Sequence, residues 1–221
     1  MKHFILRLLE MIMGLAFFSL GIVFTIMANI GYAPWDVFHY GLVNTMGISF
    51  GLSSILVGFI IMAVLFILKE KAGIGTLCNM VLIGIFIDLI MYSGIIPLQE
   101  NLIFGILFLI IGMILISVGT YFYIRTGFGI GPRDNLMVVL TRVARVPVGI
   151  CRSAVELLVT AAGWLLGGMV GIGTVVLVIG IGFFIQLTFR LFRFDITAVK
   201  HESVLETINS LRRPGDHKNG D

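Results

Sequence analysis

Six long apolar runs constrain this chain more than any other feature of its sequence. They cover residues 5–30, 52–68, 76–92, 102–124, 150–166 and 174–192. A helix needs about 20 residues to cross the hydrocarbon core of a bilayer. Of all residues, 58% are hydrophobic and 12% charged, whereas about a quarter are charged in soluble domains. The sequence therefore predicts an all-α integral membrane protein with six transmembrane helices.

The charged and reactive residues indicate no nucleic-acid, metal or enzymatic function. The net charge of +3 follows from the tendency of membrane proteins to keep lysine and arginine on the cytoplasmic side. Cys78 and Cys151 stand alone in apolar runs, and the four histidines form no cluster with the spacing of metal ligands. Hydrolase motifs and a P-loop are absent from the sequence. We expect no cofactor, no metal ion and no catalysis.

An internal repeat divides the membrane domain, residues 1–192, which precedes a polar cytoplasmic tail at 193–221. Residues of repeat one, 1–93, recur 98 positions later in repeat two, 99–192. The equivalent pairs include Gly31 and Gly129, Pro34 and Pro132, Asp36 and Asp134, Gly51 and Gly149, Gly84 and Gly182, and the runs Gly73 to Thr76 and Gly171 to Thr174. Because the first apolar run matches one in mid-chain, it is predicted to be a retained helix and not a signal peptide. Residues 196–211 are expected to form a short surface helix.

The basic residues predict how the chain crosses the membrane. All 15 lie before or at the beginning of the first apolar run, or around the connections that follow the even-numbered runs. Since lysine and arginine resist translocation, both termini are predicted to be cytoplasmic. Three spans in each repeat then give two inverted repeats, an arrangement typical of transporters and channels, in which equivalent broken helices meet at a central site. The alternative is a stable bundle without a pathway.

A repeated Gly-x-x-Pro-x-Asp connection follows the first apolar run of each repeat. It comprises Gly31, Pro34 and Asp36, and again Gly129, Pro132 and Asp134. Glycine and proline predict a break in the helix at this point. The aspartates are expected to cap new helices over 37–46 and 135–143, or else these helix starts enter the membrane and face a solute. The equivalent residues Trp35 and Arg133 fit the outer and inner interfaces of the bilayer.

Ionisable residues within the apolar runs are costly in lipid and therefore indicate function or pairing. Glu10 is predicted to pair with Arg7, three residues earlier in the sequence. Glu156 is predicted to pair with Arg152, four residues earlier on the same helix face. Glu156 nevertheless stays a candidate for a solute pathway because of its depth in the fifth run.

Asp88 has no basic neighbour in its own run, and an unpaired carboxylate in hydrocarbon needs compensation. We expect it to face the bundle interior, where the segment that begins at Asp36 supplies N–H groups or admits water, and its protonation to be linked to solute passage. Its repeat equivalent is Gln186. The candidate pathway residues are therefore Asp36, Asp88, Asp134, Gln186 and Glu156.

The repeated motifs resemble a known family of bacterial membrane proteins. The connections Gly31-Tyr32-Ala33-Pro34-Trp35-Asp36 and Gly129-Ile130-Gly131-Pro132-Arg133-Asp134, with the two Gly-Ile-Gly-Thr turns, are similar to the YczE/YyaS/YitT-like proteins, chiefly the YczE branch. The likeness covers residues 14–192, while the short tail differs from the longer soluble domain of YitT-type members. The resemblance implies a multi-pass protein of the bacterial plasma membrane and supplies no substrate or catalytic residue.

Two functions are compatible with these features. The first is a secondary transporter or channel for a small solute, with its pathway between the two repeats. The second is a non-transporting scaffold or accessory protein that acts through a partner, and a homo-oligomer is compatible with either. A pathway predicts Asp36, Asp88, Asp134 and Gln186 around a polar cavity, whereas a scaffold predicts a dry centre.

The distribution of basic residues predicts the outcome of cysteine-accessibility labelling. With six spans and both termini inside, a cysteine placed near Trp35 should react with an impermeant reagent added outside, because that connection lies on the outer side. A cysteine placed near Arg142 should react only after the membrane is permeabilised. The reverse pattern would show that the assigned orientation is wrong.

Overall fold

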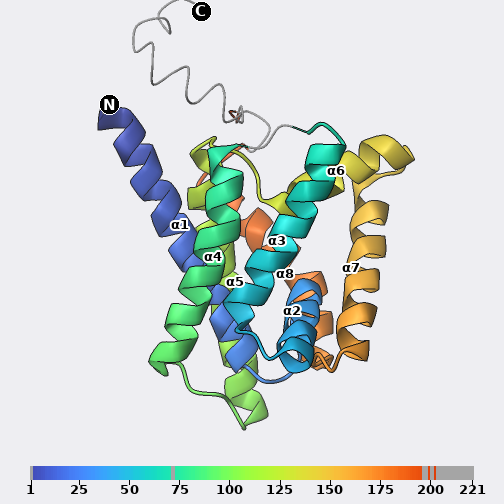
Figure 1. The fold of residues 1–221 in the computed structure, drawn as a ribbon. Coiled ribbons are helices and arrows are strands. Elements are labelled where there is room, and N and C mark those ends of the chain that lie inside the picture. Colours follow the sequence, from blue (N-terminus) through green and yellow to red (C-terminus); the bar gives the residue numbers. More distant parts are fainter. Residues whose placement is uncertain (1, 71–72, 196–198, 200–201, 203–221) are drawn as a thin grey trace, which may run out of the picture.

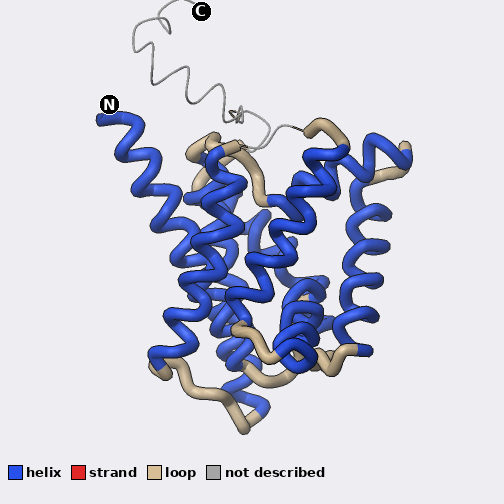
Figure 2. Tube along the Cα trace, in the orientation of Figure 1, coloured by secondary structure: helices blue, strands red, loops and turns tan. Residues whose placement is uncertain are grey.

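The computed structural model describes residues 2–70, 73–195, 199 and 202. This part of the chain is all-helical, with eight helices and no strand (Figures 1 and 2). The helices are α1 (Lys2–Met27), α2 (Pro34–Met46), α3 (Phe50–Ile67), α4 (Ile74–Ser93), α5 (Leu102–Arg125), α6 (Pro132–Ala144), α7 (Val148–Leu165) and α8 (Ile172–Leu191). The surface helix predicted over 196–211 falls on residues outside the described part, apart from 199 and 202.

Six of these helices are long and apolar enough to cross a membrane: α1, α3, α4, α5, α7 and α8. They coincide with the six predicted runs to within a few residues, which confirms the spans. The other two helices, α2 and α6, have 13 residues each and follow the Gly-x-x-Pro-x-Asp connections. A helix of that length rises only about 20 Å, so it is too short to cross the hydrocarbon core.

The starts of α2 and α6 correct the predicted capping role of the aspartates. Each helix begins at its proline, after Ala33 or Gly131, and no side chain caps either start. Proline suits the first position because its missing N–H would have no partner there and its φ is already helical. Asp36 and Asp134 therefore lie inside the first turn and do not act as caps.

The turns before α2 and α6 depend on glycine and dock on other helices. Gly31 and Gly129 have φ values of 120° and 121°, which residues with a Cβ rarely adopt. The N–H of Gly173 donates to the carbonyl of Ile30 at 2.7 Å, and the N–H of Gly75 donates to the carbonyl of Phe128 at 2.8 Å. The same turn thus contacts the start of α8 in one case and the start of α4 in the other.

The helices form two groups according to their contacts. α1 packs on α4 and α5, and α5 packs in turn on α8, which gives the row α4, α1, α5, α8. In the second group α2 packs on α7 and α3, and α6 packs on α3 and α7. The main link between the groups is the packing of α3 and α6 on α4. Figure 1 shows α7 at the edge of the bundle.

Four glycines allow the backbones of α1 and α5 to approach closely. A Cβ added at Gly14 would lie 2.9 Å from the carbonyl oxygen of Gly119, and one added at Gly21 would lie 2.7 Å from that of Gly112. Small residues permit this kind of contact between membrane helices. Gly112 and Gly119 are themselves 98 residues after Gly14 and Gly21, so the two contacts correspond to each other.

Ion pairs connect neighbouring helices near the chain's N-terminal end and correct one predicted pair. Glu10 of α1 pairs with Arg125 of α5 at 2.7 Å. Arg7, the predicted partner of Glu10, instead donates to the carbonyl of Thr126 at 2.9 Å and pairs with Glu202. The predicted Arg7–Glu10 pair was local in sequence, whereas the close approach of α1 and α5 brings Glu10 to a partner on the adjacent helix.

Replacing Gly21 by alanine should destabilise the protein, because the added Cβ meets backbone atoms of α5 that cannot move independently. Overpacking of this kind costs about 1–3 kcal/mol. The matched control is Gly182→Ala, since a Cβ at Gly182 has no atom within 4 Å. The measurement is thermal unfolding of purified protein in detergent, and equal stability of the two variants would contradict the assigned role of the α1–α5 contact.

Candidate functional site

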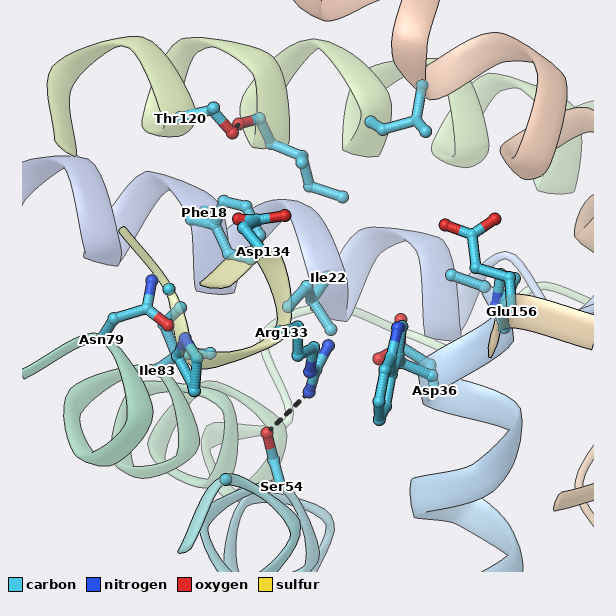
Figure 3. Close-up of a pocket in the computed structure, with 18 of the residues that line it drawn as sticks. Phe18, Ile22, Asp36, Ser54, Asn79, Ile83, Thr120, Arg133, Asp134 and Glu156 are labelled. Atoms are coloured by element: carbon cyan, nitrogen blue, oxygen red, sulfur yellow. Dashed lines mark hydrogen bonds between the residues drawn. The ribbon is translucent and has the colours of Figure 1, made fainter. Parts of the chain in front are cut away.

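A cavity of about 200 Å³ lies in the interior of the bundle and is lined by residues of all eight helices (Figure 3). Its volume corresponds to roughly seven water molecules at about 30 Å³ each. Apolar residues such as Phe18, Ile22 and Ile83 form part of the wall. The polar lining residues are Asp36, Ser54, Asn79, Thr120, Tyr123, Arg133, Asp134, Arg152 and Glu156.

The N-terminal ends of α2 and α6 meet at this cavity. Ala33 to Asp36 and Gly131 to Asp134 are all lining residues. The first backbone bonds of the two helices run from Val37 N–H to the Ala33 carbonyl, at 2.8 Å, and from Asn135 N–H to the Gly131 carbonyl, at 3.0 Å. The N–H groups before them have no partner within the helix and give each end a positive partial charge. Two such ends therefore converge on one enclosed space.

Arg133 of α6 crosses the cavity to the first half of the chain. One of its terminal nitrogens donates to Ser54 Oγ at 3.2 Å and lies 3.2 Å from His39 Nε2. Its guanidinium also lies 5.1 Å from the centre of the Trp35 ring, a distance that favours cation–π attraction. The predicted placement of Trp35 and Arg133 at opposite bilayer interfaces is therefore wrong, because the two side chains stack on each other.

His39 is held in a neutral form by its surroundings. Arginine has only donors, so His39 Nε2 accepts from Arg133 and Nδ1 carries the proton. Nδ1 lies 3.7 Å from Asp36 Oδ1, beyond hydrogen-bond range. The side chain is fully buried. Burial, and then the charge of Arg133, lower the pKa of His39 from 6.5 to about 4, in a helix that is not one of the six spans.

The exposure of the charged side chains indicates where the cavity opens. The side chain of Arg152 is 51% exposed, that of its ion-pair partner Glu156 is 17% exposed and that of Asp36 is 5% exposed. Asp134, at the start of α6, is exposed and has Arg152, Arg133 and Glu156 as charged neighbours. The cavity therefore opens beside the N-terminal part of α7 and is closed on the side of α2.

Three of the five candidate pathway residues line this cavity: Asp36, Asp134 and Glu156. The predicted Arg152–Glu156 pair is present, with 2.8 Å between Nε and Oε1. Pro34 and Pro132 of the helix-break motif also line it, while Gly31 and Gly129 lie in the turns just before. Within the described residues, no three His, Cys, Asp or Glu side chains are placed to hold a metal ion.

Asp88 and Gln186 are not among the residues that line the cavity. Asp88 accepts hydrogen bonds from Ser49 Oγ at 2.5 Å and from the N–H of Gly51 at 2.7 Å. Its carboxylate is therefore compensated at the start of α3 and not, as expected, by the segment that begins at Asp36. The expectation failed because Ser49 and Gly51 are far from Asp88 in sequence and become its neighbours only when α3 packs on α4.

Sequence reasoning missed several residues of the site, above all Arg133 and His39. A signal for His39 was present, since it lies three residues after Asp36 and thus on the same helix face. Arg133 stands between the proline and the aspartate of the repeated motif, which places it with the other lining residues. No sequence pattern singled out Ser54, Asn79, Thr120 or Tyr123, which reach the cavity from three different spans.

Comparison with known proteins connects the chain to bacterial membrane proteins. Residues 5–190 match the family model described as "Family of unknown function (DUF6198)". The chain is 33% identical over 189 residues to "Uncharacterized membrane protein YczE" of Bacillus subtilis, covering 85% of this chain and 87% of that protein. It is 32% identical to an "Uncharacterized protein" of Haemophilus influenzae, covering 82% and 84%, and 29% identical to "Uncharacterized protein YyaS" of Bacillus subtilis, covering 75% and 83%. No solved structure is significantly similar to the chain.

The lowered pKa of His39 predicts a loss of stability in acid. Its pKa is about 4 in the folded protein against 6.5 for the free group, so below pH 6.5 the unfolded chain binds the proton more readily and unfolding is favoured. The effect is absent above pH 7 and amounts to about 3 kcal/mol near pH 4. Thermal unfolding in detergent between pH 7 and 4.5 should therefore show a steeper decline for the parent than for His39→Gln. Parallel declines would contradict the buried neutral histidine.

Proposed function

The chain belongs to the DUF6198 family of bacterial membrane proteins, and we propose that it is a secondary transporter for a small polar solute in the plasma membrane. The observation that carries this proposal is the meeting of two short-helix N-termini at one cavity with charged side chains. Charged groups are costly at membrane depth and are characteristic of substrate and ion pathways. In transporters, helices interrupted in mid-membrane supply such sites where two repeats face each other. The proposal assigns the protein no catalytic residue.

An inverted repeat supports a transport mechanism and forms part of the proposal. The bounds of α3 and α4, moved by 98 residues, coincide with those of α7 and α8. The first repeat begins with a helix that runs away from the chain's N-terminal end, while its equivalent α5 runs back toward that end (Figure 1). We therefore expect the repeats to be related by about half a turn around an axis in the membrane plane.

The proposed orientation has both termini in the cytoplasm. The described basic residues outside the cavity lie at or near the helix ends on the side where α1 begins, including Lys69, Arg125, Arg142 and Arg190. By the positive-inside rule this side is cytoplasmic, so the cavity opens inward. For labelling from outside, Met46 is a better site than Trp35, since Met46 is 60% exposed at the end of α2 and Trp35 stacks on Arg133.

The charge balance of the cavity favours a zwitterionic or neutral polar solute. Three carboxylates, Asp36, Asp134 and Glu156, face two guanidinium groups, Arg133 and Arg152. Each helix N-terminus adds about half a positive charge, so the sum is close to zero while His39 is neutral. Donors and acceptors are both abundant, and an apolar cavity of 150 Å³ accommodates benzene. A solute with about six to ten non-hydrogen atoms therefore fits the space.

The experiment that tests this function is a solute-counterflow screen in proteoliposomes, with small zwitterions such as alanine and neutral polar solutes in the first panel. Arg133→Gln should reduce flux more than about tenfold, because the loss of a part-buried, hydrogen-bonded charge costs about 2 kcal/mol or more. The matched control is Arg142→Gln, whose side chain is 63% exposed and pairs with Glu70 outside the cavity.

The two variants separate a loss of transport from a loss of folding. Both should purify as single species, and the melting temperature of Arg133→Gln is measured beside its flux. Equal flux through Arg133→Gln and Arg142→Gln would place the pathway elsewhere. No flux for any solute through the folded parent would contradict the transporter and favour a scaffold that acts through a partner.

A further inference from the structure

Two helix pairs that are equivalent in the repeat pack very differently. α3 and α4 pack against each other, whereas α7 packs on α2 and α6 and has no comparable contact with α8 in the described part of the chain. The N-terminal part of α7 and the middle of α8 line the cavity, because Arg152, Glu156 and Ile181 are lining residues. The pair α3–α4 is thus closed and the pair α7–α8 is open.

Glycines and a carboxylate hold the closed pair together. A Cβ at Gly84 would lie 2.6 Å from the carbonyl oxygen of Gly51, and one at Gly51 would collide with the carbonyl oxygen of Gly84. Asp88, one turn beyond Gly84, accepts the N–H of Gly51 at 2.7 Å and the hydroxyl of Ser49 at 2.5 Å. Backbone contact and a charge-assisted hydrogen bond therefore fix the start of α3 against α4.

The open pair, α7 and α8, has residues equivalent to those of the closed pair, but its two helices do not pack against each other. Gly149 and Gly182 are the repeat equivalents of Gly51 and Gly84, and a Cβ at either position has no atom within 4 Å. Gln186, the equivalent of Asp88, is exposed and makes no hydrogen bond to the described residues. In a helix interior, glycine lowers stability by roughly 1 kcal/mol relative to alanine, and in this conformation Gly182 offsets that cost with no close helix contact.

We infer that the protein alternates between this conformation and a second one in which α7 closes on α8 through Gly149 and Gly182 while α3 separates from α4. The inference rests on the proposed transport function. In the second conformation the side-chain carbonyl of Gln186 accepts the N–H of Gly149, as Asp88 accepts that of Gly51. The cavity then closes beside α7 and opens beside the start of α3, on the other side of the membrane.

The contacts between helices define what moves. In the first group α2 and α6 each contact both α3 and α7, and in the second group α4, α1, α5 and α8 form a continuous row. The two groups contact each other mainly where α3 and α6 pack on α4. A rocking of the first group exchanges the α3–α4 contact for an α7–α8 contact while the contacts within each group persist.

The difference between Asp88 and Gln186 explains why the α3–α4 contact is the one formed here. A hydrogen bond to a carboxylate is roughly twice as strong as one to a neutral acceptor. Ser49, the N-cap of α3, also donates its hydroxyl to Asp88 on α4 at 2.5 Å, whereas the equivalent Pro147 before α7 has no hydroxyl. Both differences stabilise the conformation that opens beside α7.

Spin-label distances between matched positions test the inference without any solute. The positions Leu52 on α3 and Leu89 on α4 recur as Ile150 on α7 and Leu187 on α8, and all four are exposed. After replacement of Cys78 and Cys151 by alanine, each pair is labelled at introduced cysteines, and double electron–electron resonance is recorded in nanodiscs. We expect a short and a long distance for each pair, with the short 52–89 distance dominant and the short 150–187 distance in the minority.

Two variants should move these populations in opposite directions. Gly182→Leu fills the space that α7 must enter, so the short 150–187 distance should disappear while the short 52–89 distance stays. A Cβ at Gly182 has no atom within 4 Å in the conformation described, so the leucine side chain extends from a position that makes no helix contact there. Asp88→Asn weakens the bond to Gly51, so the short 52–89 population should fall and the short 150–187 population should rise with it.

The outcomes separate this inference from the proposed function. A single 150–187 distance that neither variant changes, or a 52–89 population that shifts without any change at 150–187, would overturn the alternation. Solute flux in proteoliposomes together with a permanently open α7–α8 pair would leave the transporter and remove this mechanism. Coupled shifts in the absence of flux for every solute would support the alternation and remove the transporter.

Discussion

The backbone contact between α1 and α5 is the interaction on which the rest of the structure depends. Lipid provides no hydrophobic force that drives helices together, so the first helix of each repeat must be held by close packing. Gly14 and Gly21 meet Gly119 and Gly112, and α4 and α8 pack on the outer sides of this pair. The turns after α1 and α5 then carry the short helices into the interior. Each turn docks on the start of a helix of the opposite repeat.

The interior of the bundle shows how charged groups are accommodated between apolar helices. The guanidinium of Arg133 lies over the Trp35 ring, donates a hydrogen bond to the Ser54 hydroxyl and donates another to the His39 imidazole. A buried charge without partners is strongly unfavourable, but satisfied polar networks make a fixed and specific arrangement. The neutral state of His39 belongs to this balance, since a proton on its ring would place a second cation beside Arg133. The proposed solute site is therefore rigid on the side of α2 and accessible on the side of α7.

Much of the fold was predictable from the sequence, whereas the site was predictable only in part. The six spans follow from local hydrophobicity, and the constant offset of 98 residues located the two breaks. The breaks also pointed to Asp36 and Asp134, because proline and glycine act through local geometry. The partners of Asp88 and Glu10 were not predictable, since Gly51 and Arg125 reach them through packing between helices. The same is true of the stacking of Trp35 on Arg133, which joins two residues that share one position in the repeat.

The partners of Arg133 have a consequence for the order in which the protein is made. Trp35, His39 and Ser54 all belong to the first half of the chain, so they are synthesised and inserted before Arg133 leaves the ribosome. The guanidinium therefore enters a membrane in which its acceptors are already in place. Arg7, the arginine of the first half, also binds groups of the second half, Thr126 and Glu202, but its side chain is 26% exposed near the start of α1 and does not line the cavity. The order of synthesis thus matters, because the first half supplies the binding partners for the charged residue in the helix break of the second half.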